Sequence, residues 1–172
     1  MTVLKLAQGG FTAPPNPVTL HSFLRHRPMT VTLTASYQEM LNTETVEKIE
    51  ELKDEQYCLE DMLEFIDEYN EKAFVEHYEE YVRCGEAIGY EAVDALASEN
   101  GIDNIADCDE RYQGFYDDEA EFAEHYHNEM GNYVPDGIEV DWQATWDRNL
   151  YYDFTSCNDG SSYKSCHIFR DH

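Results

Sequence analysis

Basic side chains are scarce in this chain. Its 172 residues include 11 Lys and Arg against 37 Asp and Glu, which gives a formal net charge of −26 at pH 7. Nucleic-acid binding depends on Lys and Arg side chains that neutralise phosphates, so we expect no direct binding to nucleic acid. The imbalance also exceeds what solubility requires, since a net charge of about 2 to 8 suffices for a small domain.

Long apolar runs are missing as well. No stretch approaches the roughly 20 apolar residues of a membrane-spanning helix. The apolar run at residues 3–7 is interrupted by Lys5 and is too short for a secretory segment. The five cysteines are an odd number with wide spacings. These features predict a cytoplasmic protein with reduced thiols and no membrane association.

Motifs for catalysis or metal binding are absent or incomplete. The chain has no phosphate-binding glycine loop, no Gly-x-Ser-x-Gly, no His-Glu-x-x-His and no EF-hand loop. Glu124 and His127 have the Glu-x-x-His spacing of di-iron bundles, which need a second copy that the chain lacks. Cys157, Cys166 and His167 fall short of a closed tetrahedral zinc site. We therefore expect no enzyme activity, no cofactor and no metal.

Acidic residues are abundant and concentrated in the middle of the chain. Residues 39–130 carry 30 acids and 5 bases, residues 1–38 carry 3 bases and no acid, and residues 131–172 carry 7 acids and 3 bases. Self-repulsion on this scale destabilises a compact state and is commonly offset by a basic partner. Duplex DNA carries about one charge per 1.7 Å of axis, so 26 charges correspond to roughly 13 base pairs. A surface that competes with DNA for a basic protein is therefore plausible.

Hydrophobic periodicity predicts an α+β fold that is predominantly helical. The chain is 42% hydrophobic and contains 13 Tyr and 8 Phe, which is too apolar for a solvated acidic tail. A helical middle is followed by a C-terminal β-hairpin, formed by residues 151–156 and 163–170 around Asn158-Asp159-Gly160. We expect three parts: an N-terminal region at 1–58, an acidic helical domain at 59–110 and a C-terminal α+β domain at 111–172. The N-terminal region is expected to contain a basic arm at 1–28, a short strand at 30–37 and a helix at 43–53.

The segment from residue 111 to residue 131 is the most informative stretch. Gly114 lies between two tyrosines and predicts a tight turn. Asp118 can cap a helix, and Glu121 can reach back to the cap's own amide in a capping box. The apolar residues at 122, 123, 126 and 130 predict one buried face, so the acids between them predict an outward face rich in carboxylates.

Several segments carry a family resemblance. They read Phe-Val-Glu-His-Tyr-Glu-Glu-Tyr (74–81), Gly-Tyr-Glu-Ala-Val-Asp-Ala-Leu (89–96), Tyr-Gln-Gly-Phe-Tyr-Asp-Asp-Glu-Ala-Glu-Phe-Ala-Glu (112–124), Val-Asp-Trp-Gln-Ala-Thr-Trp-Asp-Arg-Asn-Leu-Tyr-Tyr-Asp-Phe (140–154) and His-Ile-Phe-Arg (167–170). Together they resemble the ArdA antirestriction proteins of plasmids, transposons and phages. Residues 1–58 lack the Asn-x-Gly and Gly-x-Trp with which that family usually opens, so this region is divergent.

The resemblance implies an elongated acidic homodimer that imitates double-stranded DNA and has no catalytic residue. Its partner would be a type I restriction-modification enzyme, whose DNA-binding site it would occupy. Tyr112, Phe115 and Tyr116 are expected to provide packing or dimer contacts near the turn. The carboxylates expected to substitute for phosphates lie on predicted outward faces: Glu76, Glu79, Glu80, Glu91, Asp94, Asp117, Asp118, Glu119, Glu121 and Glu124.

Two other functions fit the same composition. The protein could be a DNA mimic that inhibits another DNA-binding defence system, such as a CRISPR effector. It could also be an acidic adaptor that docks on one basic protein without imitating DNA. The adaptor predicts one local epitope and no competition with duplex DNA, so a competition experiment distinguishes it from a mimic.

Overall fold

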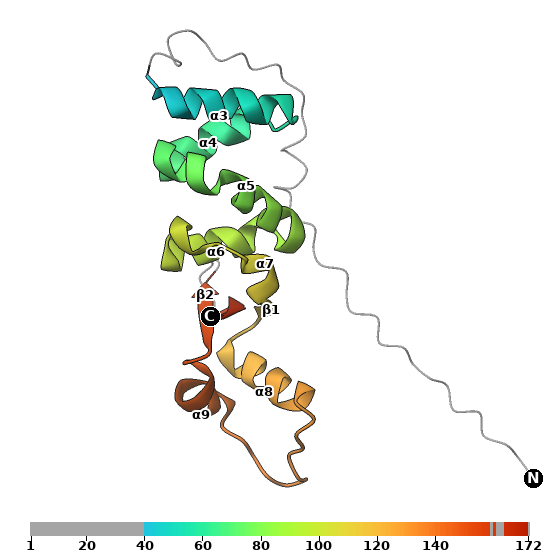
Figure 1. Ribbon diagram of the computed structural model, residues 1–172. Coiled ribbons are helices and arrows are strands. Elements are labelled where there is room, and N and C mark those ends of the chain that lie inside the picture. The colour runs from blue at the N-terminus through green and yellow to red at the C-terminus, as the bar shows by residue number, and fades with distance from the viewer. Residues whose placement is uncertain (1–39, 159, 161–163, 172) are drawn as a thin grey trace, which may run out of the picture. The chain divides into compact units, whose positions relative to one another are not determined.

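The computed structural model describes residues 40–158, 160 and 164–171, all of which belong to one compact unit (Figure 1). The fold is α+β and predominantly helical, as predicted, with seven α-helices and a three-stranded antiparallel sheet among these residues. None of the described helices has both the length and the apolar character needed to cross a membrane. The expected basic arm at 1–28 and strand at 30–37 lie outside the described residues.

Four helices make up the first part of the described chain: α3 (Thr43–Asp54), α4 (Leu59–Tyr69), α5 (Glu71–Ile88) and α6 (Tyr90–Asn100). Local chemistry sets where they begin. The Asn42 side chain accepts a hydrogen bond from the Thr45 N–H at 2.8 Å and caps α3. Asn70, with φ of 111°, ends α4, and its side chain accepts from the Ala73 N–H to begin α5. The helix predicted at 43–53 is confirmed.

The second part contains short elements around the sheet. They are the 3-10 turn η1 (Ile102–Asn104), α7 (Cys108–Arg111), β1 (Tyr112–Tyr116), α8 (Glu119–Glu129), α9 (Trp142–Thr145), the π-turn η2 (Trp146–Leu150), β2 (Phe154–Asn158) and β3 (Cys166–Arg170). The side chain of Asp118 accepts from the Glu121 N–H at 2.9 Å and caps α8, as predicted. The Glu121 carboxylate reaches back to the N–H of Asp117, one residue before the expected position.

The sheet has the strand order β1-β3-β2, and both pairings are antiparallel. The predicted C-terminal hairpin is confirmed, with Cys157 opposite His167. Its first strand begins at Phe154 and extends through Asn158, which pairs with Cys166, so Asn158 belongs to the strand and not to the predicted turn. The tight turn predicted at Gly114 is wrong, because residues 112–116 form strand β1. Its register shifts between Tyr112 and Gly114, where the φ of Gly114 is 135°. The glycine therefore accommodates an irregularity within a strand and does not reverse the chain.

Two clusters of buried side chains lie against opposite faces of the sheet. The helix core combines buried residues of α3–α6 with Ile105, Cys108, Cys157 and Phe169. The C-terminal core consists of Phe122, Ala123, Trp146, Leu150, Phe154, Cys166 and Ile168. Strand β3 contributes to both cores because successive side chains of a strand point to opposite faces.

Candidate functional site

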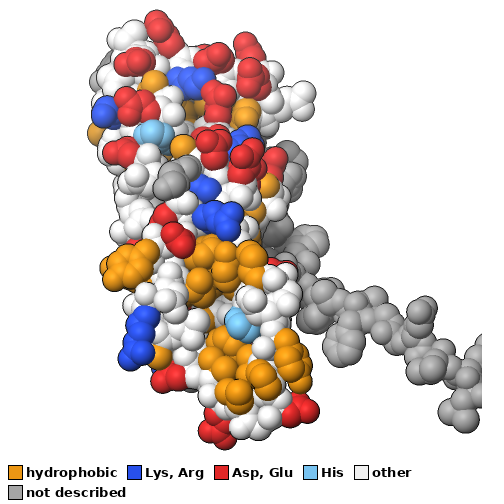
Figure 2. Space-filling view, turned by 60° about the horizontal axis from the view of Figure 1, so that its bottom comes forward, with side chains coloured by type: hydrophobic (Ala, Val, Ile, Leu, Met, Phe, Trp, Pro, Cys, Tyr) orange, Lys and Arg blue, Asp and Glu red, His pale blue; other side chains and the backbone are white. Residues whose placement is uncertain are grey.

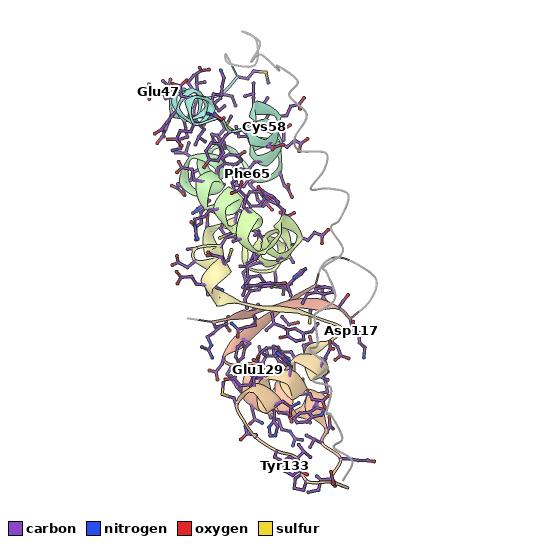
Figure 3. All side chains as sticks on the ribbon, turned by 90° about the vertical axis from the view of Figure 1, so that its right-hand side faces the viewer. Glu47, Cys58, Phe65, Asp117, Glu129 and Tyr133 are labelled. Carbon is purple, nitrogen blue, oxygen red and sulfur yellow. The ribbon has the colours of Figure 1, made fainter. Side chains whose placement is uncertain are left out.

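Carboxylates line the surface of the described chain. None of the described Asp and Glu residues is buried. Helix α4 alone has five acids and no base among its 11 residues. Glu47 and Asp117 point away from the ribbon in Figure 3, whereas Phe65 lies among the helices. Figure 2 shows acidic side chains densest toward one end of the visible face and hydrophobic patches largest toward the other end, where a few acidic groups also lie.

The few basic side chains between residues 40 and 130 already have partners within the protein. Arg111 donates to the backbone carbonyls of Asn104, Ala106 and Arg170. The other four bases contact carboxylates, in the pairs Lys48 with Glu51 and Glu79, Lys53 with Glu50, Lys72 with Glu76, and Arg83 with Glu80 and Asp109. The surplus of acids in this region therefore remains as an unbalanced negative field.

The ten carboxylates proposed from the sequence fall into two groups in the structure. Six are exposed, namely Glu76, Glu79, Glu91, Asp117, Glu121 and Glu124. The remaining four are half-buried, namely Glu80, Asp94, Asp118 and Glu119. They belong to α5, α6, α8 and the turn before α8, so the set is distributed over several elements and does not form one pocket.

Each half-buried carboxylate is engaged in a hydrogen bond that supports the fold. Asp94 accepts from the Tyr81 hydroxyl at 2.6 Å, which joins α6 to α5. Glu119 accepts from the Ser156 hydroxyl at 3.0 Å and so links α8 to β2. Asp118 is the cap of α8. These carboxylates stabilise the helices that present the exposed acids, and this role does not depend on whether a partner contacts them.

Glu80 is the most extensively bonded of the ten. Its carboxylate accepts from Arg83 Nε at 3.0 Å and Nη2 at 2.6 Å, and from the Asp107 N–H at 2.9 Å. Arg83 also donates to Asp109, which ties α5 to α7. The hydrogen bonds from Arg83 hold the pKa of the Glu80 carboxyl below its ordinary value, against the opposing effect of partial burial.

Glu80→Gln is expected to lower the free energy of unfolding by about 1 kcal/mol at pH 7, because hydrogen bonds to an ionised group are lost. The stabilisation from a lowered pKa is fully present above the unfolded pKa of about 4.3 and is lost as the pH falls through the folded value. Urea unfolding of the two proteins between pH 7 and pH 3 should therefore show a difference that shrinks as the pH falls.

Glu124→Gln is the matched control, because this exposed carboxylate has no hydrogen bond or ion pair within the described residues. We expect it to change stability by less than about 0.5 kcal/mol at any of these pH values. A Glu80→Gln deficit of equal size at pH 7 and pH 3 would contradict the electrostatic explanation and assign the loss to packing.

The three aromatic residues proposed for packing or dimer contacts are placed differently from one another. Tyr112 is half-buried, its hydroxyl lies 3.0 Å from His167 Nδ1, and burial raises its pKa to about 12. The half-buried ring of Tyr116 lies 5.2 Å from that of Phe122 in the C-terminal core. Phe115 is 51% exposed. The two tyrosines pack within the chain, and Phe115 retains an exposed ring on an edge strand.

The side chains that the sequence analysis considered as possible zinc or iron ligands do not come together in one site. Cys157 belongs to the helix core and Cys166 to the C-terminal core, and burial raises their thiol pKa values to about 12 and 11 respectively. All five cysteines are free thiols. The ring of His127 packs against Trp142 with centroids 5.2 Å apart, while Glu124 is exposed.

One cluster was not anticipated from the sequence. Glu76 and His77 on α5 lie beside Asp103 on η1, with ligand atoms within 4.8 Å of one another. No sequence motif links the residues, because Asp103 follows His77 by 26 positions. Only the packing of η1 against α5 brings them together.

The fold and surface define an acidic, predominantly helical α+β protein that presents carboxylates from several helices. No protein-family model, curated protein or solved structure matches the chain.

Proposed function

We propose that this protein is an antirestriction protein that imitates double-stranded DNA and occupies the DNA-binding site of a type I restriction-modification enzyme. The observation that carries the proposal is the unbalanced carboxylate surface of residues 40–130, where the bases are already engaged within the protein. A partner with basic side chains could therefore supply compensating positive charge. A DNA-binding groove offers such charge as an extended array of Lys and Arg.

The mechanism needs no reacting group. Carboxylates on α4, α5, α6 and α8 would take the places of phosphates and accept hydrogen bonds from the basic side chains of the target. Binding would then depend on many charges, each contributing modestly, because surface ion pairs are typically worth about 0.2–1 kcal/mol. The protein would act in the bacterial cytoplasm without a cofactor.

We further propose that the protein acts as a homodimer. A second copy would double the charge and so match roughly 26 base pairs at the charge density of duplex DNA. Of the three aromatic residues expected near this contact, Phe115 is the one with an exposed ring. Sedimentation equilibrium that shows only monomers at the concentration of the inhibition assay would remove the dimer from the proposal.

Competition for the target tests the proposal directly. The purified protein is expected to displace labelled duplex DNA from a type I restriction-modification enzyme. Its affinity for the enzyme should fall steeply as salt is raised from about 50 to 200 mM, because screening shortens the reach of each charge. Binding to the enzyme without displacement of DNA would contradict mimicry and favour an acidic adaptor. Failure to bind this enzyme at all would overturn the choice of target.

A further inference from the structure

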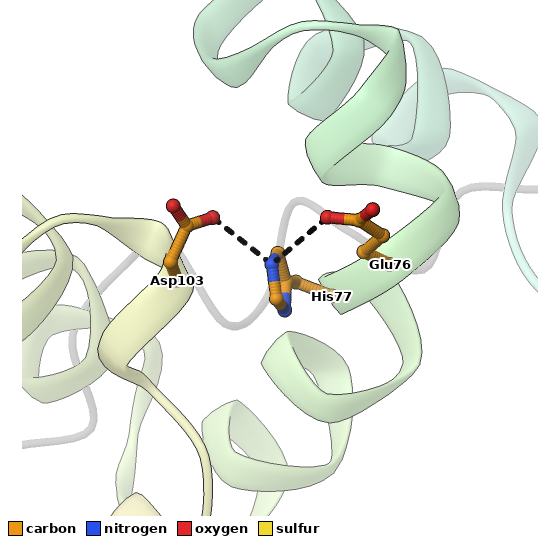
Figure 4. Close-up of side chains that lie close together, drawn as sticks. All are labelled: Glu76, His77 and Asp103. Carbon is orange, nitrogen blue, oxygen red and sulfur yellow. Dashed lines mark hydrogen bonds and ion pairs between the residues drawn. The ribbon is translucent and has the colours of Figure 1, made fainter.

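A histidine and two carboxylates converge on the surface of the helical part (Figure 4). His77 Nε2 lies 3.0 Å from Asp103 Oδ1 and 3.7 Å from Glu76 Oε2. Glu76 and His77 are neighbours on α5, and Asp103 comes from η1. Among the described residues, no other group of three or more His, Cys, Asp or Glu side chains has potential ligand atoms this close together.

The spacing of these atoms suits coordination of one ion. Metal–ligand bonds of about 2.0–2.2 Å in tetrahedral geometry place neighbouring ligand atoms about 3.3–3.6 Å apart. The two separations from His77 Nε2, 3.0 and 3.7 Å, lie just below and just above that range. The third pair of ligand atoms, on Glu76 and Asp103, lies within 4.8 Å, and these side chains are 47% and 77% exposed, so rotation can bring their oxygen atoms to that spacing. Water can complete the coordination shell.

The backbone under the cluster is held by packing and hydrogen bonds. Arg111 donates to the carbonyl of Asn104, and the Asn104 side chain donates to the carbonyl of Asn100. Ile105, directly after η1, is fully buried in the helix core. The turn that carries Asp103 is thereby fixed beside α5. A site whose ligands come from two fixed elements loses less conformational entropy on binding than one in a loop.

The local charge favours a cation. Glu76 also contacts Lys72 at 3.5 Å, but this is an i,i+4 pair whose lysine side chain is 78% exposed. Such surface pairs are weak, typically about 0.3–0.5 kcal/mol. Lys72 can therefore turn to solvent when an ion binds.

We propose that Glu76, His77 and Asp103 form a binding site for one divalent first-row transition-metal ion, of which Zn²⁺ is the representative. An imidazole nitrogen favours zinc and its neighbours over Mg²⁺ and Ca²⁺, which prefer sites built from oxygen atoms alone. The ion would cross-link α5 to η1. This assignment departs from the sequence-based expectation of no metal, and it is independent of the proposed function because it concerns the isolated protein.

The test uses the full chain, purified without a histidine tag and treated with chelator. Calorimetric titration with ZnCl₂ in excess MgCl₂ should show one Zn²⁺ per chain, and Zn²⁺ should raise the Tm. His77→Gln and Asp103→Asn should each weaken Zn²⁺ binding by about tenfold or more, since even outer-shell changes cost 10–100-fold. The Zn²⁺-dependent rise in Tm should disappear in both variants.

His125→Gln is the matched control. His125 Nε2 lies 3.2 Å from Glu129 Oε1 on α8. This exposed histidine–carboxylate pair has no third potential ligand atom close enough to form a cluster among the described residues. The variant should bind Zn²⁺ like the unmodified protein. The proposal is overturned if the unmodified protein binds no Zn²⁺ under these conditions, or if His77→Gln binds it with unchanged affinity and stoichiometry. Equal losses in His77→Gln and His125→Gln would also overturn it, because they would indicate diffuse binding.

Discussion

Phe122→Ala is expected to lower the free energy of unfolding by about 3–5 kcal/mol, the usual cost of removing a buried aromatic side chain. Phe122 is 2% exposed. Its ring centroid lies 4.9–5.8 Å from those of Tyr116, Tyr126, Trp146 and Phe154. The substitution would leave a cavity where α8, the π-turn η2 and the sheet meet. Guanidinium-induced unfolding, followed by circular dichroism, measures the loss.

Tyr133→Ala is the appropriate comparison, because this aromatic side chain is 73% exposed. Its removal should change stability by less than about 0.5 kcal/mol. A Phe122→Ala protein within about 1 kcal/mol of the unmodified chain would show that the C-terminal core contributes little to stability. With total stabilities of about 5–15 kcal/mol in folded domains, the expected loss is a large fraction of the whole.

Neutralising four exposed carboxylates at once is expected to reduce affinity for the target enzyme by about 30-fold. The variant carries Glu→Gln at positions 64, 86, 91 and 124, which lie on α4, α5, α6 and α8. At about 0.5 kcal/mol for each lost charge contact, the total is about 2 kcal/mol. Each single substitution should weaken binding only about twofold. The salt dependence of binding should also become shallower in the quadruple variant.

The control replaces the same four residues with Asp, which keeps each negative charge and only shortens the side chain that carries it. This variant should retain most of the affinity and the steep salt dependence. If one Glu→Gln substitution accounted for the whole loss, a local epitope would replace distributed mimicry as the explanation. Unchanged affinity in the quadruple Gln variant would place the contact surface elsewhere.

Local chemistry was sufficient to predict much of the helical structure. Asp118 caps its helix through the amide three residues on, and the helix at 43–53 begins after the similar cap Asn42. The C-terminal hairpin was also predictable, because two strand-like runs lie on either side of a turn-forming sequence, although Asn158 itself belongs to strand β2. These signals act within a few residues, so sequence reasoning detects them.

Features that depend on distant segments were missed. Strand β1 is only five residues long and contains Gly114, which by itself favours a turn; its strand conformation depends on pairing with β3. Contacts with distant segments also change how exposed a surface carboxylate is. Sequence periodicity placed Glu80 and Asp94 on outward faces, but their bonds to the Asp107 N–H and the Tyr81 hydroxyl draw them partly inward.

Strand β3 also constrains the order in which the protein can fold during synthesis. Within the described sheet, β1 and β2 each pair with β3 and not with each other. Neither strand can complete its ladder until residues 166–170 have left the ribosome. The helix core likewise lacks Phe169 until then. A ribosome-bound chain that stops before residue 166 should therefore leave this sheet unformed, and the sheet should form only after residues 166–170 have emerged.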